Sequence, residues 1–391
     1  MMRILYLFSL LLLTTGVKAQ TTKSYDQIDQ EALQIPDRLT KSTRDIADYI
    51  KQHFDNPDDR SRAIFVWIAR NIQYDLANMF AINFYENTSE VIDDVLKNRK
   101  GVCMHFAELY NEIANQSGIK SYVIAGYTKQ NGFVDYIPHA WCGSLVGTDW
   151  YLFDPTWGSG YVQNEKFVNK LNNYYFKAKP EQLISSHMPF DPLWQFLSYP
   201  VTNQEFYEGK TSMNKTKPEF NYLDTLKQYE QQSETERLVS SAGRIEKNGV
   251  RNSMISDRLQ HIKREIGYYN NKQMVETFNA ATSLYNSGVN QLNQFINYRN
   301  SQFSPSKPDS EIQEMVDVAE KCFLASRDKL KEIKNPDPNV AGSIAQLNGS
   351  IDESMKNLAQ QKDFLDKYFK TGKMFRKSLF YKYKWMGVPL N

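Results

Sequence analysis

The stretch KGVCMHFAELYNEIA, residues 100–114, places a cysteine just behind a glycine at the start of a predicted helix. If residues 102–116 are helical, Cys103 lies in the first turn and shares a face with Ala107 and Tyr110. Unpaired backbone N–H groups and the positive end of the helix dipole favour a thiolate at that position. Cys103 is therefore either a nucleophile or a small residue of the core, and its partners must decide between the two.

A nucleophilic thiol needs a base and a group that orients the base. His105 lies two residues from Cys103, about 200° around the helix, so we expect it to point elsewhere. His139 begins a β-rich run that ends at Asp154, with Gly147 at a predicted hairpin turn. Because side chains alternate along a strand, His139 and Asp154 can pair across the hairpin, which leaves one ring nitrogen for sulfur. We predict a catalytic set of Cys103, His139 and Asp154.

The same segments also fit another kind of site. The motifs CMH and HAWC together contain two cysteines and two histidines, which is a zinc-like set. The helix geometry points His105 away from Cys103, and strand alternation places Cys142 opposite His139, as a thiol of the core. We therefore expect neither a metal ion nor another cofactor.

The order of the segments around Cys103 indicates the fold class. Two segments with helical spacing precede it, and two β-rich runs follow its own helix. Helices followed by an antiparallel sheet are typical of an α+β domain, which we assign to residues 20–200. The predicted helices are residues 44–54, 61–75 and 101–117, and the β-rich runs are residues 120–129 and 139–154.

The composition changes beyond residue 200. Residues 219–300 and 309–370 are rich in Gln, Asn, Lys, Glu and Leu at helical spacing, and proline-containing breaks divide them. No heptad pattern persists, so we predict an antiparallel helical bundle within an all-α region, residues 201–391. His261 lies amid ordinary helical spacing and is predicted to be a surface residue.

The last residues, 370–391, combine basic and aromatic side chains and contain no acidic residue. Such a tail can contact a membrane or an anionic polymer. The alternative is a solvated helix end whose aromatic side chains dock on the bundle, and the charge pattern favours this alternative. We expect the helical region to position the first domain or to bind a protein partner.

The first residues, MMRILYLFSLLLLTTGVKA, carry one early positive charge, an apolar run and a small residue at Ala19. This pattern is typical of a cleaved secretory signal, because the apolar run is shorter than the ~20 residues of a membrane-spanning helix. Removal of residues 1–19 takes away Arg3 and Lys18, so the net charge of +2 becomes 0. We predict an exported protein, periplasmic or secreted, with no nucleic-acid partner. Three cysteines are too few, and odd in number, for a disulfide framework.

These motifs resemble those of the transglutaminase-like superfamily, whose fold is the papain-like α+β arrangement. KGVCMHFAELYNEIANQSGIKSYVIAGYTK is similar to its cysteine helix and first strand, and HAWCGSLVGTDWYLFDPTWGSG is similar to its histidine and aspartate strands. AIFVWIARNIQYD resembles the helix that precedes them. The resemblance covers about residues 40–160 and implies the nucleophile at Cys103, the base at His139 and the orienting acid at Asp154. Cys142 stands where the family often has an asparagine.

The resemblance implies a thiol enzyme that acts on an amide bond through a thioester, in the bacterial or kyphoscoliosis-peptidase-like branch of the family. The family also includes protein crosslinkers and inactive scaffolds. We expect hydrolysis rather than amine transfer, because no amine-binding feature can be identified, and a protein, peptide or cell-wall peptide as the substrate. The alternative is an inactive binding or scaffold protein, which the presence of all three triad residues in motif order disfavours. The backbone N–H of Cys103 is the expected first oxyanion donor, whereas neither Trp67 nor Trp141 matches the family's second donor.

Overall fold

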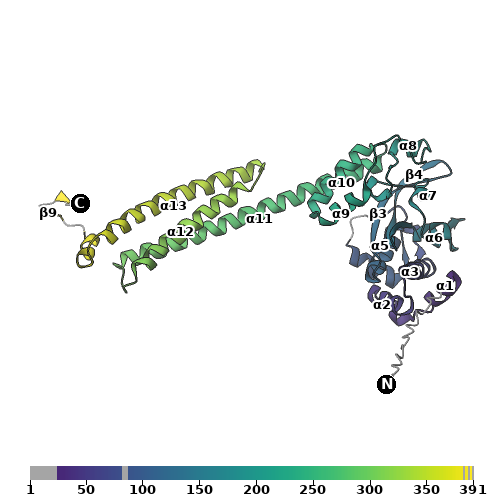
Figure 1. The fold of residues 1–391 in the computed structure, drawn as a ribbon, viewed down its shortest axis with the longest axis horizontal. Coiled ribbons are helices and arrows are strands. Elements are labelled where there is room, and N and C mark those ends of the chain that lie inside the picture. Colours follow the sequence, from purple (N-terminus) through teal and green to yellow (C-terminus); the bar gives the residue numbers. More distant parts are fainter. Residues whose placement is uncertain (1–23, 82–86, 382–383, 386–387, 390–391) are drawn as a thin grey trace, which may run out of the picture. The chain divides into compact units, whose positions relative to one another are not determined.

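The computed structural model describes most of the chain, and its elements are labelled in Figure 1. The chain forms two compact units that divide between Lys263 and Arg264, within helix α11 (Ser253–Asn300). The predicted signal peptide lies outside the described residues. None of the helices that the structure describes combines the length and the apolar character needed to cross a membrane. The described residues are 24–81, 87–381, 384–385 and 388–389.

The first unit is built around a four-stranded antiparallel sheet with the strand order β5-β4-β3-β8. Helical segments pack against both faces of this sheet, which confirms the α+β class predicted from the order of the segments. The strands are β3 (Ser121–Gln130), β4 (Phe133–Val146), β5 (Asp149–Phe153) and β8 (His187–Pro189).

Strand β4 begins earlier than expected, at Phe133 rather than at His139. A turn at Asn131 and Gly132 joins it to β3, and both residues have positive φ angles of 51° and 83°. Asn-Gly is the preferred pair for a two-residue hairpin of this geometry, so the sequence contained the signal. His139 therefore lies inside a long strand, opposite Gly126 of β3.

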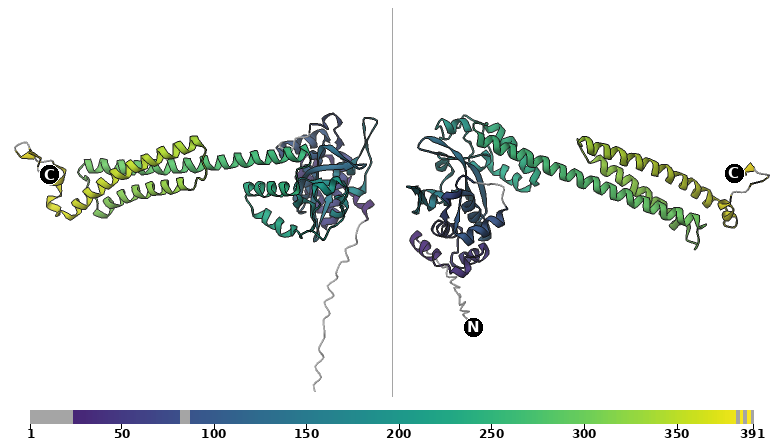
Figure 2. Two further views of the ribbon diagram at one scale, coloured as in Figure 1. Left: turned by 90° about the horizontal axis from the view of Figure 1, so that it is seen from above. Right: turned by 180° about the vertical axis from the view of Figure 1, so that it is seen from behind.

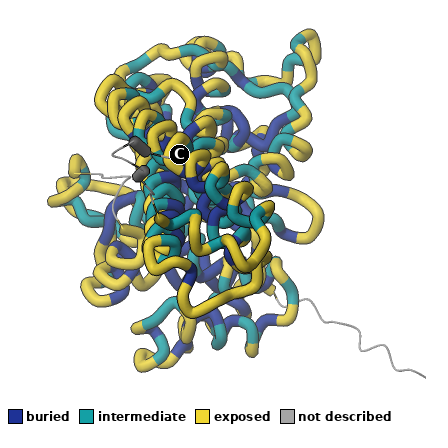
Figure 3. Tube along the Cα trace, turned by 90° about the vertical axis from the view of Figure 1, so that its left-hand side faces the viewer, coloured by how far each residue is buried: buried dark blue, intermediate teal, exposed yellow. Residues whose placement is uncertain are grey.

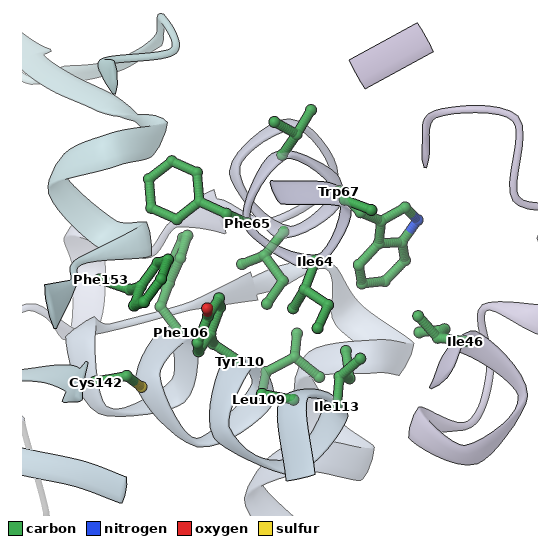
Figure 4. Close-up of a cluster of buried hydrophobic side chains, with 14 of the residues drawn as sticks. Ile46, Ile64, Phe65, Trp67, Phe106, Leu109, Tyr110, Ile113, Cys142 and Phe153 are labelled. Carbon is green, nitrogen blue, oxygen red and sulfur yellow. The ribbon is translucent and has the colours of Figure 1, made fainter. Parts of the chain in front are cut away.

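One face of the sheet packs against α5 (Cys103–Gln116), which in turn contacts α2 (Thr43–His53) and α3 (Pro57–Asn71). Apolar side chains of these helices form the main core with Cys142 and Phe153 of the strands (Figure 4). All three helices lie close to their predicted positions, because each has apolar residues one turn apart. Along the trace, buried and exposed residues alternate over short distances, as expected where one face of an element packs in a core (Figure 3).

The opposite face of the sheet carries a second apolar cluster. Trp150 of β5 stacks on Phe196, with ring centroids 4.7 Å apart. Leu226 of α9 (Tyr222–Gln231) is buried in the same cluster, although it lies well beyond residue 200. Helical segments that follow the change in composition therefore complete the core around the sheet.

An ion pair holds α10 (Glu234–Asn248) to the same unit. Arg244 donates from Nε and Nη2 to the two carboxylate oxygens of Asp191, at 2.8 and 2.7 Å. His261, predicted to lie on the surface, is half-buried, because the first turns of α11 also pack within this unit. The change in composition at residue 200 marks where the strands end, and the compact unit extends further because these helices cover the sheet.

The second unit is an antiparallel bundle in which the rest of α11 runs beside α12 (Asp309–Lys331) and α13 (Pro338–Lys370) (Figure 2). Its core is apolar, and Phe295 and Phe323 are fully buried in it. The breaks between the helices contain prolines, as predicted, because proline cannot continue a helix. The bundle prediction is thus confirmed for the described residues of this unit.

Part of the C-terminal tail, residues 373–380, docks on the bundle. Phe380 packs against Phe303 with ring centroids 5.5 Å apart. Arg376 donates to both carboxylate oxygens of Asp309, at 2.7 and 2.8 Å. Met374 remains 88% exposed. Contact of this tail with a membrane or an anionic polymer stays a prediction.

Candidate active site

Cys103 is the first residue of α5 and is only 1% exposed. The side chain of His105 caps the start of this helix, because its Nδ1 atom accepts a hydrogen bond from the Val102 N–H at 3.0 Å. Gly101 makes room for this ring, since a Cβ atom there would lie 2.6 Å from the Cβ atom of His105. The Sγ atom of Cys103 lies 4.0 Å from the carbonyl oxygen of Pro138 in β4. The helix start and β4 therefore meet at this thiol.

The central strands bring His139 to this end of the helix. His139 is opposite Gly126 of β3, which is paired on its other side with Pro189 of β8. A Cβ atom on Gly126 would lie 2.2 Å from the carbonyl oxygen of Met188 and 2.5 Å from the ring of Trp141. Glycine at this position is therefore required for β8 to approach β3 so closely.

Asp154 binds the imidazole ring of His139. The Nε2 atom of His139 lies 2.8 Å from Oδ2 of Asp154, so Nδ1 is the ring nitrogen left for the sulfur of Cys103. The last rung between β4 and β5 joins Cys142 to Phe153, and Asp154 follows it. The expected pair is thus present, but it forms just beyond the end of the ladder rather than across a rung.

Asp154 also caps the short helix that follows it, α6 (Pro155–Ser159). Its Oδ1 atom accepts hydrogen bonds from the backbone N–H groups of Thr156 and Trp157, at 2.9 and 3.1 Å. Its Oδ2 atom lies 3.0 Å from Nε2 of His187, in addition to the imidazole described above. Four donors therefore surround the carboxylate, which is the number that its two oxygens can accept. They allow Asp154 to be ionised although it is fully buried.

The charges of the site are set by burial and by these contacts. Burial would raise the pKa of Asp154, but the charge of His139 and the hydrogen bonds from His139 and His187 lower it below its usual range. Burial would lower the pKa of His139, but the charge of Asp154 and hydrogen bonds with Asp154 and Cys103 raise it to about 10. Burial lowers the pKa of His187. At neutral pH the site therefore holds an anionic Asp154, a cationic His139 and a neutral His187.

His139 lines a cleft of about 1060 Å³ in the first unit. Trp157 lies over His139, with ring centroids 5.4 Å apart. Lys129 and Lys170 also line the cleft, and none of its described lining residues is acidic. Its aromatic walls are formed by Tyr74, Trp157, Tyr161, Phe167, Tyr174 and Tyr175. A cleft of this size accommodates several residues of an extended peptide beside His139.

The geometry agrees with a comparison of the sequence with known families. Residues 44–155, which include the cysteine, histidine and aspartate described above, match the sequence model of the transglutaminase-like superfamily. The chain carries a transglutaminase-like domain. The resemblance predicted from the motifs is thereby confirmed.

The transglutaminase-like domain has relatives among curated proteins. "Kyphoscoliosis peptidase" from Homo sapiens is 31% identical over 156 residues, which cover 38% of this chain and 23% of that protein. The Mus musculus protein of that name is 27% identical over 190 residues, which cover 46% of this chain and 28% of that protein. A solved structure described as a TGase is 20% identical, covers 39% of this chain and 37% of that one, and has a TM-score of 0.24. This chain therefore spans less than a third of the length of these two curated relatives.

One group of side chains in the first unit has the composition of a metal site. Among the described residues, His139, Asp154 and His187 bring three candidate ligand atoms within 4.8 Å of one another. Both Nε2 atoms, however, lie 2.8 and 3.0 Å from one carboxylate oxygen. Ligands at ~2.1 Å from a tetrahedral ion are about 3.4 Å apart, so the observed spacing is that of hydrogen bonds.

The zinc-like set suggested by the sequence is dispersed in the transglutaminase-like domain. The Sγ atom of Cys142 lies 3.2 Å from the carbonyl oxygen of Ala107, inside the core. Burial raises the pKa of this thiol far above its ordinary value, so it stays protonated. The ring of His105 is engaged at the start of α5, as described above. Cys142 is therefore a thiol of the core, as predicted from strand alternation.

His187 is the residue of the site that sequence reasoning missed. It is 1% exposed and lies in the three-residue strand β8. Its neighbourhood in the sequence, SSHMPFD, is too short for a periodic pattern, and the chain between it and Asp154 contains no motif that links them. Only the pairing of β8 with β3 brings it to the carboxylate. His187 is opposite Thr128 of β3, and this pairing could be expected only once the order of the strands in the sheet was known.

Proposed function

We propose that the protein is an exported thiol enzyme that acts on an amide bond through a thioester. The observation that carries the proposal is the hydrogen bond from His139 to Asp154 next to the first turn of α5, where Cys103 lies. The raised pKa of His139 supports it, because a protonated imidazole stabilises a neighbouring thiolate. Cys103 is then the nucleophile, His139 the acid and base, and Asp154 the group that orients the imidazole.

The proposed reaction proceeds in two halves. The Cys103 thiolate forms a bond to the carbonyl carbon, and the backbone N–H of Cys103 donates to the resulting oxyanion. As the carbon–nitrogen bond breaks, the proton on Nδ1 of His139 passes to the leaving amine and a thioester remains. His139, now neutral, takes a proton from water, whose oxygen displaces the sulfur. The products are a carboxylic acid and an amine, and the thiolate and the imidazolium are restored.

We prefer hydrolysis to transfer of the acyl group to a second amine. The two reactions share the thioester, and they differ in whether water or an amine reaches it. The names of the two mammalian relatives contain the word peptidase, which supports hydrolysis. Incubation with a peptide library in the presence of a simple primary amine separates the two reactions, because mass spectrometry distinguishes a new carboxyl group from a new amide.

The cleft beside His139 supports a protein, peptide or cell-wall peptide as the substrate. Its aromatic side chains can pack against the backbone and side chains of an extended chain. Its lining carries the positive charges of Lys129 and Lys170, which would favour substrates that contain a carboxylate group.

Labelling with iodoacetamide at neutral pH tests the proposed nucleophile. Cys103 is 1% exposed, whereas Cys322 is half-buried in the helical bundle. If exposure alone governed reactivity, Cys322 would react first; an activated Cys103 reverses this order. We expect the Cys103→Ala variant to lose the fast phase of labelling, which peptide mass spectrometry assigns to one cysteine.

The Cys142→Ala and Cys322→Ala variants are the matched controls, and both should keep the fast phase. Labelling of Cys322 ahead of Cys103, or equal labelling of all three thiols, would overturn the proposal. The second candidate function, an inactive scaffold, is favoured by the deep burial of Cys103. It predicts a slow Cys103 in every condition, including in the presence of peptides that bind the cleft.

A further inference from the structure

A second buried histidine shares the carboxylate oxygen that binds His139. The Nε2 atoms of His139 and His187 lie 2.8 and 3.0 Å from the same atom, Oδ2 of Asp154. We propose that His187 is a positioning residue of the active site, which holds Asp154 and limits how strongly this carboxylate binds the proton of His139. The inference rests on the proposed function for its catalytic meaning, but the shared oxygen is a property of the fold itself.

The donors around Asp154 leave the carboxylate one orientation. Oδ1 is occupied by the backbone N–H groups of Thr156 and Trp157. Oδ2 is occupied by the two imidazoles, so rotation of the carboxylate would break several hydrogen bonds at once in a buried site. His187 supplies one of the two bonds that fix Oδ2, and the direction in which His139 is held depends on this atom.

The protonation state of His187 follows from its other partner. Its Nδ1 atom lies 2.8 Å from Oγ of Ser186. Burial lowers the pKa of His187, so the ring is neutral and carries its single proton on Nε2, where Asp154 accepts it. The hydroxyl of Ser186 also lies 3.3 Å from the carbonyl oxygen of Leu183, and it donates its one proton to the nearer acceptor, Nδ1 of His187. Ser186 itself lines the cleft. A chain of hydrogen bonds thus leads from the cleft through His187 and Asp154 to His139.

Sharing an oxygen between two donors weakens the attraction for each. A carboxylate that binds His139 alone would raise the pKa of this imidazole further than one that also binds His187. His139 must release its proton in the first half of the reaction and take one up in the second, so a pKa that is too high slows the cycle. His187 therefore tunes His139 through Asp154 without touching the substrate.

The other titratable groups near this cluster come from several elements. Asp135 of β4 interacts with His187, and Tyr175 and Tyr74 interact with Asp154. Tyr74 and His139 also interact with the Cys103 side chain. Both tyrosines have raised pKa values because they are buried, so they remain neutral through the range in which the histidines titrate.

The alternative role of His187 is packing alone. Its ring lies 4.7 Å from the ring of Trp157 and 5.1 Å from that of Trp141, measured between centroids. Two substitutions separate the roles. His187→Leu keeps most of the volume and removes the donor, whereas His187→Gln places an amide N–H near the position of Nε2 and retains it.

The experiment measures the titration of His139 by NMR in the full chain, with histidines labelled at the ring Cε1. We expect His187→Leu to raise the pKa of His139 by about one pH unit. His187→Gln should restore it to within a few tenths of a unit of the wild-type value. A wild-type titration in His187→Leu, or equal shifts in the two variants, would overturn the inference.

Two features keep the test decisive. If His187→Leu fails to fold, as judged by thermal unfolding, Ser186→Ala serves as the second variant, because it removes the donor to Nδ1 of His187. It should raise the pKa of His139 by a smaller amount. An unchanged titration of His139 in this variant would count against the inference. The NMR measurement does not depend on activity. Slow alkylation of wild-type Cys103 would therefore overturn the proposed function, while the shift of His139 still decides the role of His187.

Discussion

The geometry of the site depends most on Asp154. This residue directly follows β5, caps α6 and accepts a hydrogen bond from each of two imidazoles. Its burial would favour the neutral acid, and its donors reverse that preference. The negative charge of Asp154 keeps His139 protonated, so the pH dependence of the proposed reaction should depend on this carboxylate.

The pH profile of the proposed reaction should follow the protonation of His139. The pKa of His139 is raised to about 10, so the imidazolium that would protonate the leaving amine in the proposed reaction persists through neutral pH. Activity is lost as the pH rises through the folded-state pKa of His139, and the alkaline limb should lie well above pH 7. Initial rates of cleavage of a peptide substrate between pH 5 and 11 measure it. An alkaline limb near the ordinary histidine value of ~6.5 would contradict the prediction.

Asp154→Asn is the matched variant for this prediction. Asparagine keeps an oxygen that can cap α6, but it removes the charge that raises the pKa of His139. The alkaline limb should move down by roughly one to three pH units, as expected for the loss of an adjacent opposite charge. An alkaline limb that does not move in Asp154→Asn would show that a group other than Asp154 raises the pKa of His139.

At the scale of elements, the closeness of three strands decides where the functional side chains meet. Gly126 of β3 is opposite His139 on one side and Pro189 on the other. The absent side chain is what allows β8 to lie against β3 while the Trp141 ring covers the same position. Because Gly126 has no side chain, β8 can lie close to β3, and the sheet then brings His139 and His187 to the carboxylate of Asp154.

Gly126→Ala should destabilise the fold by about 1–3 kcal/mol, as is usual when a methyl group is forced into a packed interior. Its Cβ atom would lie 2.2 Å from the carbonyl oxygen of Met188, and backbone cannot move aside as a flexible side chain does. Gly243→Ala in α10 is the control, because a Cβ atom there meets nothing within 4 Å. It should stabilise the helix by roughly 0.5–1 kcal/mol. Urea unfolding measures both, and equal midpoints for the two variants would refute the packing argument.

In the whole molecule, the first unit extends to Lys263, beyond the change in composition at residue 200. Leu226 of α9 is buried against the sheet, and Arg244 of α10 binds the nearly buried Asp191. Neither contact is visible in the composition beyond residue 200, which resembles that of the bundle. The helices after residue 200 therefore serve two units, the first few covering the sheet and the rest forming the bundle.

Truncation tests this division. A chain of residues 24–263 should remain monomeric and unfold cooperatively, because it keeps the helices that cover the second face of the sheet. A chain of residues 24–200 exposes Trp150 and Phe196 and leaves Asp191 without its arginine, so we expect it to aggregate or unfold. Size-exclusion chromatography and thermal unfolding compare the two. If the chain of residues 24–200 were as stable as the chain of residues 24–263, the first unit would end at residue 200.

Local patterns in the chain were enough to predict the helices and most of the strands, because apolar spacing and turn residues act over a few positions. They also placed Cys103 in the first turn of α5 and paired His139 with Asp154, since a hairpin is a local structure. Tertiary structure alone decided that His187 joins the same carboxylate and that helices after residue 200 cover the sheet. These contacts join segments far apart in the chain, and their energy depends on complementary shape and buried charge, which no local pattern records.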